Sequence, residues 1–442
     1  MTTLPSSLVT VTPADDAYRY LRSTYTTPHS PAQILLPSSP SEVQQAMAYA
    51  SGTDLPVSIR SGGHGLAGTS SNDGGIVVDL SRMDAVTVLD RPTGLVRVDA
   101  GARWAQIAVA LAPHGLAISS GDHGNVGVGG LATAGGIGWL VRRYGLTIDH
   151  VRAATVVLPS GELVRADEAN PDLLWAVRGA GSFVGVVTDL DIEAMELPGI
   201  QVGQVVIEID RDGRALVEWS RFLQAAPREL TMSGVLAASG GRLVLVLTAV
   251  FAGTDAPRAH AALAPLLARP GVHAGGLQNA RYTDLVPAGH LHANVGQQPS
   301  ATTNALLAAF TAESAPALIE IARHPSGPFV QVRGVGGAAA DIARDATAFW
   351  HRDAEVLVTV TLFPPRGAGE LAAVARPLWS HALGAYRNFE SHPSEATFAR
   401  AFPGATGERV RELARRYDPD GVLHRVFLPA PRELGRQDVK PE

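Results

Sequence analysis

The sequence contains no cysteine, and this absence removes several classes of chemistry. Without thiols the chain has no disulfide, no thiolate metal site, no iron–sulfur cluster and no cysteine nucleophile. Lysine is nearly absent as well, because Lys440 is the only one, and arginine supplies almost all of the positive charge. No lysine is therefore placed to complete a phosphate-binding P-loop.

The chain also lacks a strong net charge and long hydrophobic runs. A net charge of −6 gives no electrostatic reason to bind nucleic acid or acidic membranes. No apolar run approaches the ~20 residues that span a bilayer, and the N-terminal residues do not resemble a signal peptide. We expect a soluble cytoplasmic protein, monomer or homodimer, that binds a small molecule and neither nucleic acid nor a membrane.

The length of 442 residues allows at least two cores. Short strands, helices and glycine-rich turns alternate up to about residue 198, and residues 34–60 predict a β-α-β unit whose helix is capped by Ser41. Strands are predicted at 75–81, 85–90, 95–101 and 151–161, with a helix at 104–115. Beyond 199 the pattern predicts helices at 212–226, 255–270, 339–354 and 407–417 and strands at 203–210, 241–251 and 355–363.

The first glycine-rich loop, SIRSGGHGLAGTS at 58–70, surrounds a single histidine, His64. Glycine admits positive φ and lets an anion approach the main chain, while Ser61 and Thr69 add hydroxyl donors. A pyrophosphate is the ligand that this loop favours, although its spacing matches no common nucleotide motif. The predicted cofactor-binding residues of this loop are Arg60, Ser61, Gly62, Gly63, His64, Gly65, Gly68 and Thr69.

The second glycine-rich stretch, residues 119–150, is longer and more apolar. Its glycines would let a flat ring system lie close to the backbone, and its polar residues offer hydrogen bonds. The alternative is that both loops merely connect strands in a compact domain. The predicted cofactor-binding residues here are Gly121, Asp122, His123, Asn125, Val126, Gly129, Gly130, Thr133, Gly135, Gly136 and Gly138.

These two loops, with GGIVVDLSRM (74–83), RGAGSFVGVVTDLDI (178–192) and YRNFES (386–391), resemble the vanillyl-alcohol oxidase superfamily, in its berberine-bridge-enzyme-like group. The resemblance implies a two-domain α+β flavoprotein. An FAD-binding domain would comprise residues 1–198, with a core of about 28–196, and the C-terminal segment 386–442 would return to it. Residues 199–385 would form a substrate domain with an antiparallel sheet flanked by helices.

The resemblance also implies how the flavin is held. In that family a histidine at the position of His64 is bonded to the 8α-methyl of the flavin, which raises its reduction potential. Many members add a cysteine link, but His123 stands at that position, so a single covalent link to FAD is expected. Val126 stands where oxygen-reactive members carry a small aliphatic residue, and we expect Val187 and Asn388 to contribute to the cofactor site.

The family motif that carries the proton acceptor is changed in this chain, because Y-x-N-Y reads YRNF here. Phe389 replaces the tyrosine that often takes the substrate proton in related oxidases. Tyr386 is the preferred substitute, followed by His392, with Glu390 and Tyr144 as further candidates. Two alternatives remain open: the chemistry needs no base here, or Tyr386 is a buried residue packed under the flavin.

The resulting expectation is an FAD-linked oxidase that takes hydride from a small organic substrate, a secondary metabolite, to flavin N5 and returns the electrons to O2 as H2O2. The rivals are an enzyme that oxygenates its substrate and a flavin-containing resistance protein that sequesters or reoxidises a toxic compound. No metal is expected, because His290 and His292 lack a third ligand nearby in sequence. We expect Arg352 and Asp353 to hold a helix end, and Trp219, Trp350 and Trp379 to lie in helices of the core.

Overall fold

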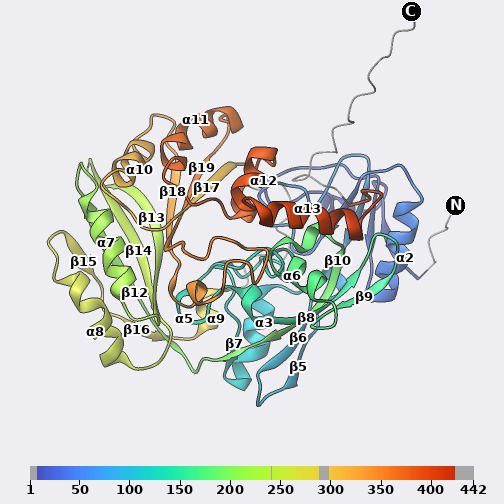
Figure 1. Cartoon of the computed structure of the whole chain (residues 1–442), viewed down its shortest axis with the longest axis horizontal. Coiled ribbons are helices and arrows are strands. Elements are labelled where there is room, and N and C mark those ends of the chain that lie inside the picture. The colour runs from blue at the N-terminus through green and yellow to red at the C-terminus, as the bar shows by residue number, and fades with distance from the viewer. Residues whose placement is uncertain (1–6, 240, 288–297, 424–442) are drawn as a thin grey trace, which may run out of the picture.

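The computed structural model of the chain describes residues 7–239, 241–287 and 298–423. Figure 1 shows two groups of elements side by side, each built around its own sheets. The blue to teal elements of the N-terminal part lie on the right, together with the red helices α12 (Glu395–Ala401) and α13 (Ala405–Tyr417). The green to orange elements form the group on the left. This mixture of helices and sheets confirms the α+β fold class.

A four-stranded sheet contains the predicted β-α-β unit. Its elements are β1 (Val9–Val11), β2 (Gln33–Leu36), α2 (Pro40–Ser51), β3 (Val57–Arg60) and β4 (Ile76–Asp79). β2 and β3 both pair with β4 in parallel, with α2 in the crossover. The predicted cap was wrong, because the hydroxyl of Ser39, not that of Ser41, accepts the N–H of Glu42. Pro40 then takes the first helical position, where its fixed φ suits a helix and no N–H is needed.

A five-stranded antiparallel sheet forms the second layer of this group, and the C-terminal helices pack against it. Its strands, in spatial order, are β5 (Val86–Asp90), β6 (Leu95–Asp99), β10 (Val186–Glu193), β8 (Val151–Val157) and β9 (Leu163–Ala166). The predicted strands near 85, 95 and 151 and the helix α3 (Trp104–Leu111) are confirmed. One hydrophobic core joins the sheet to α6 (Pro171–Ala180) and to Phe398, Phe402 and Leu413 of the C-terminal segment.

Short elements complete this group and its connections. They are α1 (Tyr18–Leu21), β7 (Leu116–Ala117), α4 (Val128–Leu131), α5 (Val141–Tyr144), β11 (Met195–Glu196), α9 (Tyr282–Leu285) and the 3-10 turns η1 (Leu80–Arg82), η2 (Ala112–His114), η3 (Thr147–His150), η4 (Gly181–Phe183), η5 (Gly337–Asp341) and η6 (Arg387–Phe389). β7 pairs with β11, next to the point where the chain crosses to the other group.

An eight-stranded antiparallel sheet forms the second group. Its strands are β12 (Ile200–Ile209), β13 (Leu230–Ser239), β14 (Arg242–Phe251), β15 (Val272–Ala274), β16 (Gln278–Ala280), β17 (Ala301–Leu307), β18 (Phe329–Gly334) and β19 (Val356–Leu362). The helices α7 (Arg214–Ala225), α8 (Ala256–Leu267), α10 (Ser314–Ala322) and α11 (Ala368–Trp379) share one hydrophobic core with it. Trp219 is fully buried in that core and Trp379 packs at its margin.

The opposite face of this sheet turns toward the N-terminal group. Val330, Val332 and Val358 pack with the helices, so strand alternation places Gln331, Arg333 and Thr359 on the other side. Leu306 and Leu357, which share that second side, belong to a core with Ile137, Val141 and Tyr386 from the N- and C-terminal segments. The two groups therefore meet along a partly polar sheet face.

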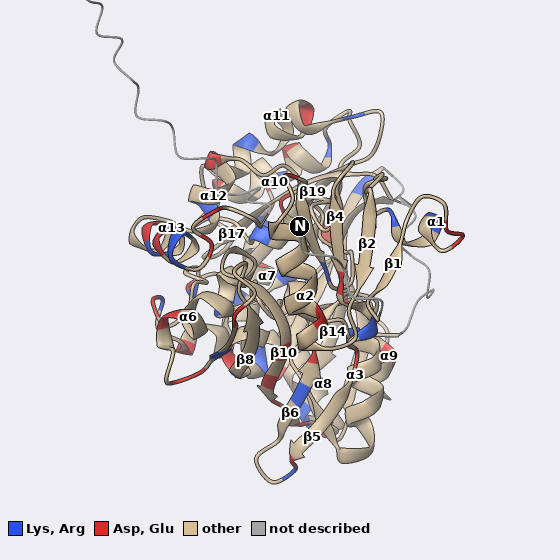
Figure 2. Cartoon of the chain, turned by 90° about the vertical axis from the view of Figure 1, so that its right-hand side faces the viewer, with Lys and Arg blue, Asp and Glu red and all other residues tan. Residues whose placement is uncertain are grey.

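Charged residues of both signs are spread along the chain. In the view of Figure 2, basic and acidic residues are interspersed, and α13 shows both along its length. Within the described part of the chain, no helix combines the length and apolar composition needed to cross a membrane.

The helix predicted over 339–354 is wrong. After η5 the backbone is irregular, because this stretch packs into the N-terminal group rather than onto its own sheet. Ala348 is fully buried in the core of the five-stranded sheet, and its N–H binds the carbonyl of Arg178 at 3.0 Å. Arg352 forms a buried ion pair with Asp149 at 2.8 Å, and Asp149 in turn accepts the N–H of Leu146 at the start of η3. Asp353 pairs with Arg344, and Trp350 lies outside any helix.

Arg142 fastens the N-terminal group to the eight-stranded sheet. Its side chain is 2% exposed, and it donates hydrogen bonds to the carbonyls of Leu223 (2.6 Å), Leu230 (2.9 Å) and Val335 (3.0 Å) and to Glu355 (3.3 Å). A guanidinium is the only side chain with enough donors for such a set.

Replacing Arg142 with Met should destabilise the protein by about 3–5 kcal/mol, because several buried carbonyls and Glu355 lose their donor. The matched control is Arg228→Met, which removes a paired but exposed arginine and should cost much less stability than Arg142→Met, because solvent screens that pair. Urea unfolding of both variants measures the difference. Equal losses would show that Arg142 does not hold the two groups together.

Candidate active site

The first glycine loop follows β3 and is anchored at its start by a buried ion pair. Arg60 is fully buried, and its Nε and Nη2 lie 2.7 and 2.6 Å from Asp79 Oδ2 at the end of β4. Arg60 also donates to the carbonyl of Ser23. The guanidinium of Arg60 thus binds Asp79 and Ser23 within the protein, and this argues against the direct cofactor contact that was predicted for Arg60.

The two glycine loops cross in backbone contact. A Cβ added to Gly62 would lie 2.2 Å from the nitrogen of Gly127, and a Cβ on Gly127 would lie 2.2 Å from the nitrogen of Gly62. Real side chains never approach so closely, so both positions require glycine. The N–H of Gly129 donates to Ser61 Oγ at 3.2 Å, which adds a second link between the loops. The sequence predicted both loops, and the structure brings them together.

Arg103 pins this crossing, and sequence reasoning missed it. Its Nη1 donates to the carbonyl of Gly62 at 3.1 Å and to that of Asn125 on the other loop. Burial lowers the pKa of Arg103, which remains a cation at neutral pH. The segment GARWAQI contains this residue, but no chemical motif there distinguished it from any other arginine before a helix.

Three rings gather at the crossing. His64 stacks on Tyr25 with centroids 4.5 Å apart, and its centroid lies 5.3 Å from that of His123 on the second loop. Tyr25 is held by its hydroxyl bond to Gln298 at 2.8 Å and by its N–H to the carbonyl of Gly63. Burial raises the pKa of Tyr25, so it stays a neutral phenol. Tyr25 was not predicted, because it lies far from both loops in sequence.

The remaining predicted residues divide by exposure. One set is exposed or part-exposed: Ser61, His64, Gly65, Thr69, Asp122, His123, Val126, Gly129, Gly130 and Asn388. The other set is buried: Gly62, Gly63, Gly68, Gly121, Asn125, Thr133, Gly135, Gly136, Gly138 and Val187. Several buried glycines are needed for packing of the protein itself: a Cβ on Gly138 would meet the carbonyl of Ser120 at 2.1 Å. At Gly65 and Gly130 an added Cβ would meet nothing within 4 Å, so these positions border open space.

Tyr386 lies beneath the second loop. Its phenol oxygen accepts the N–H of Gly136 at 3.1 Å and the amide of Asn388 at 3.2 Å, and Asn388 also donates to the carbonyl of Gly130. Tyr386 is 2% exposed, and burial raises its pKa. A base near neutral pH requires the opposite shift, so this geometry argues against Tyr386 as the proton acceptor and favours a positioning role.

Phe389 packs under an arginine that joins the sheet to the second loop. The Arg333 guanidinium lies 4.9 Å from the Phe389 ring, and its Nε and Nη2 lie 2.9 and 2.8 Å from Asp122 Oδ2. Its Nη1 donates to Thr359 at 3.2 Å. Sequence reasoning missed Arg333, although the alternation of β18 would have placed it on the same face as Gln331.

The other base candidates lie in occupied or outlying positions. Glu390 accepts from Thr303 Oγ1 at 2.9 Å and from the amide of Asn304 at 2.9 Å, along the outer edge of β17. His392 is exposed and contacts Ser391, and partial burial lowers its pKa. The hydroxyl of Tyr144 donates to the carbonyl of Glu196, and burial raises its pKa. His290 and His292 lie outside the described residues.

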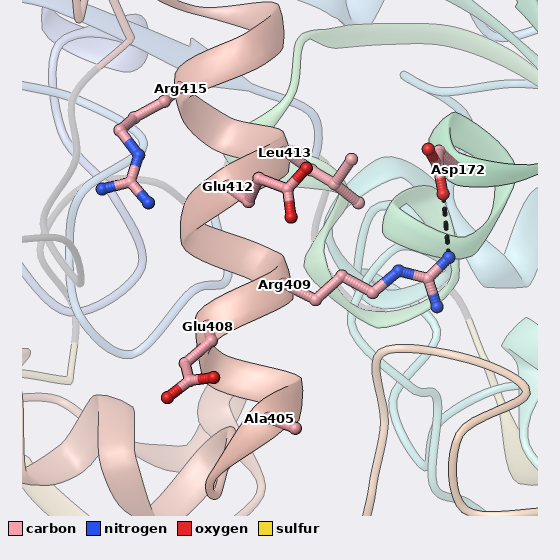
Figure 3. A pocket seen from close by; sticks show the side chains of 7 residues that line it. All are labelled: Asp172, Ala405, Glu408, Arg409, Glu412, Leu413 and Arg415. Carbon is pink, nitrogen blue, oxygen red and sulfur yellow. Dashed lines mark hydrogen bonds and ion pairs between the residues drawn. The ribbon is translucent and has the colours of Figure 1, made fainter.

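A surface hollow between α6 and α13 is a separate feature (Figure 3). Arg409 extends from α13 toward Asp172 and binds it at 2.9 Å, and Arg416 binds the same carboxylate at 2.7 Å. Its lining is mostly charged, and the Asp172–Arg409 pair joins the two helices there.

Gly62→Ala should destabilise the protein by about 3 kcal/mol or more, because the new methyl group must push two backbones apart. Gly65→Ala in the same loop is the matched control and should change stability by less than about 1 kcal/mol, since open space surrounds it. Thermal and urea unfolding of the two purified variants provide the comparison. A stable Gly62→Ala protein would contradict the backbone crossing.

Glu390 should make stability depend on pH. Burial raises its pKa to about 7 from an ordinary 4.5, while the Arg400 charge opposes the shift. Between about pH 4.5 and about pH 7, the carboxyl of Glu390 is ionised in the unfolded chain but protonated in the folded protein. The contribution of Glu390 to stability should therefore be complete below about pH 4.5 and should be lost, by up to about 3 kcal/mol, as the pH rises through about 7.

Glu390→Gln should remove this part of the pH dependence, measured by urea unfolding between pH 4.5 and 8. Glu412→Gln alters an exposed residue of α13 and should follow the wild-type curve. An unchanged slope in the Glu390 variant would show that this carboxyl is ionised in the folded protein throughout the range.

The comparisons with known proteins agree with this geometry. Residues 31–167 match the family described as FAD binding domain. (R)-6-hydroxynicotine oxidase of Paenarthrobacter nicotinovorans is 39% identical over 169 residues, which are 38% of this chain and 37% of that enzyme. The chain spans about half or less of the first curated relatives it matches.

Solved structures match along most of the chain. A chitooligosaccharide oxidase has a TM-score of 0.85 at 23% identity, covering 95% of this chain and 96% of the other. A glucooligosaccharide oxidase from Acremonium strictum, described with a 6-S-cysteinyl, 8α-N1-histidyl FAD, has a TM-score of 0.84 at 22% identity and covers 95% and 96%. Residues 31–167 therefore match an FAD binding domain, and the chain shares its overall fold with these solved oxidases.

Proposed function

We propose that this protein is an FAD-linked oxidase of a small organic substrate, a secondary metabolite. The observation that carries the proposal is the crossing of the two glycine loops with His64 at the junction. A flavin bound there would supply hydride acceptance at N5 and return of the electrons to O2 as H2O2. The match of residues 31–167 to an FAD-binding domain supports this choice of cofactor.

The residues at the junction fit an FAD. Open space at Gly65 and Gly130 leaves room beside the loop backbones, whose N–H groups suit a pyrophosphate. Residues 1–198 and 386–442 would hold the cofactor, and residues 199–385 would cover the flavin with their polar sheet face. Gln331 and Thr359 on that face offer hydrogen bonds to a substrate that bears hydroxyl or amine groups.

A single covalent link through His64 is part of the proposal. The related glucooligosaccharide oxidase has a flavin with one histidyl and one cysteinyl bond. This chain has no cysteine, so a cysteinyl bond cannot form. His64 is part-buried and stacked on Tyr25, whereas His123 is exposed.

Acid precipitation tests the link. The precipitated wild-type protein should stay yellow, because a covalent flavin survives unfolding, and intact mass should include that of FAD. His64→Ala should release its flavin into the supernatant, while His123→Ala, the matched control in the second loop, should retain it.

Release of flavin from the His123 variant alone would show that the covalent bond is formed by His123 and not by His64. Release from wild type would mean that the flavin is not covalent, and a colourless native protein would remove the oxidase proposal. Hydrogen peroxide formation with candidate substrates, including 6-hydroxynicotine and xylobiose, then tests the activity. Transfer of label from 18O2 to product would instead identify an oxygenating enzyme.

A further inference from the structure

The oxidation proposed above needs a group that accepts a proton. A substrate that becomes a carbonyl or an imine loses a hydride from carbon and a proton from its oxygen or nitrogen. Phe389 cannot take that proton. Tyr386 uses its phenol oxygen to bind Gly136 and Asn388, and Glu390 is engaged with β17.

Asp122 lies where the two groups of elements and the two loops meet. It directly precedes His123, whose ring neighbours that of His64, and its carboxylate reaches Arg333 on the inward face of the sheet. The charge of Asp122 acts on the hydroxyls of Tyr386 and Tyr282, whose pKa values it helps to raise. The Asp122 carboxylate is therefore close both to Tyr386, which lies beneath the second loop, and to the inward face of the eight-stranded sheet.

One oxygen of this carboxylate is open. Both bonds from Arg333 go to Oδ2, and within the described part of the chain no hydrogen bond is made to Oδ1. The Asp122 side chain is 30% exposed, whereas that of Arg333 is 7% exposed. Thr359 and the Phe389 ring hold the guanidinium in place, so the carboxylate is oriented with Oδ1 available.

We propose that Asp122 is the catalytic proton acceptor, with Arg333 as its positioning residue. This inference rests on the proposed oxidase function. The proton on the substrate oxygen or nitrogen passes to Asp122 Oδ1. The electron pair of the broken O–H or N–H bond then forms the C=O or C=N bond. The hydrogen of the adjacent C–H bond leaves with its electron pair, as hydride, to the cofactor. Asp122 later returns its proton to solvent. The charged and titratable groups that face it are Arg333, His123, Tyr282 and Tyr386.

The first test uses sodium sulfite, which adds to reactive flavins and bleaches their absorbance, and needs no substrate. Asp122→Asn removes a negative charge beside the cofactor and should tighten sulfite binding three- to tenfold, because the anion is repelled less. Asp172→Asn, which breaks an arginine pair at the distant α6–α13 surface, should leave sulfite binding unchanged. Thermal unfolding and flavin content show whether each variant is folded.

Kinetics with the compound oxidised in the peroxide assay form the second readout. Asp122→Asn should lower kcat at least 100-fold with KM within threefold, and the rise of kcat/KM with pH should disappear. Asp122→Glu, which keeps a carboxylate, should recover at least tenfold of the loss. Unchanged sulfite binding and pH profile in the Asn variant would overturn the inference while leaving the oxidase function intact. Failure of wild type to react with both sulfite and substrates would instead overturn the proposed function, and the inference with it.

Discussion

The contact between the backbones of Gly62 and Gly127 is the constraint on which the site depends. It requires two loops from different layers to approach until no side chain fits between them. Arg103 then satisfies a carbonyl on each loop, so the crossing is closed by hydrogen bonds as well as by sterics. His64 and His123 are neighbours only because this crossing brings their loops together.

Buried arginines connect the N-terminal group, which contains this crossing, to the group of the eight-stranded sheet. Arg142 extends from the N-terminal group to carbonyls of the opposite group, and Arg333 extends back from the sheet to Asp122. Arg352 with Asp149 holds a third connection. A planar guanidinium with several donors can bind several carbonyls of the facing element at once, whereas a lysine ammonium would leave most of these carbonyls unpaired. The near absence of lysine therefore has little effect on how the chain is held together.

The sequence predicted those features that local patterns determine. The β-α-β unit, α3 and the strands β5, β6, β8, β12, β14 and β19 follow from periodicity, and both glycine loops follow from composition. The strands β13, β17 and β18 were not predicted. The helix at 339–354 failed because Ala348 packs into a distant core, and no local pattern reports that contact. Arg103 and Arg333 could not be selected for a similar reason. Alternation shows which side of a strand a residue faces but not which partner lies opposite, so the role of Arg333 emerged only with the position of Asp122.

The exchange of tyrosine for phenylalanine at 389 becomes understandable in this arrangement. The Phe389 ring supports the Arg333 guanidinium, and a neutral face suits that contact without competing for its hydrogen bonds. Proton acceptance then moves from the C-terminal segment to Asp122 on a glycine loop. Since Asp122 and His123 are adjacent, the loop that borders the cofactor also carries the base. The geometry between hydride acceptor and proton acceptor is thus set by one backbone crossing, together with the contact by which Arg333 of the sheet orients Asp122.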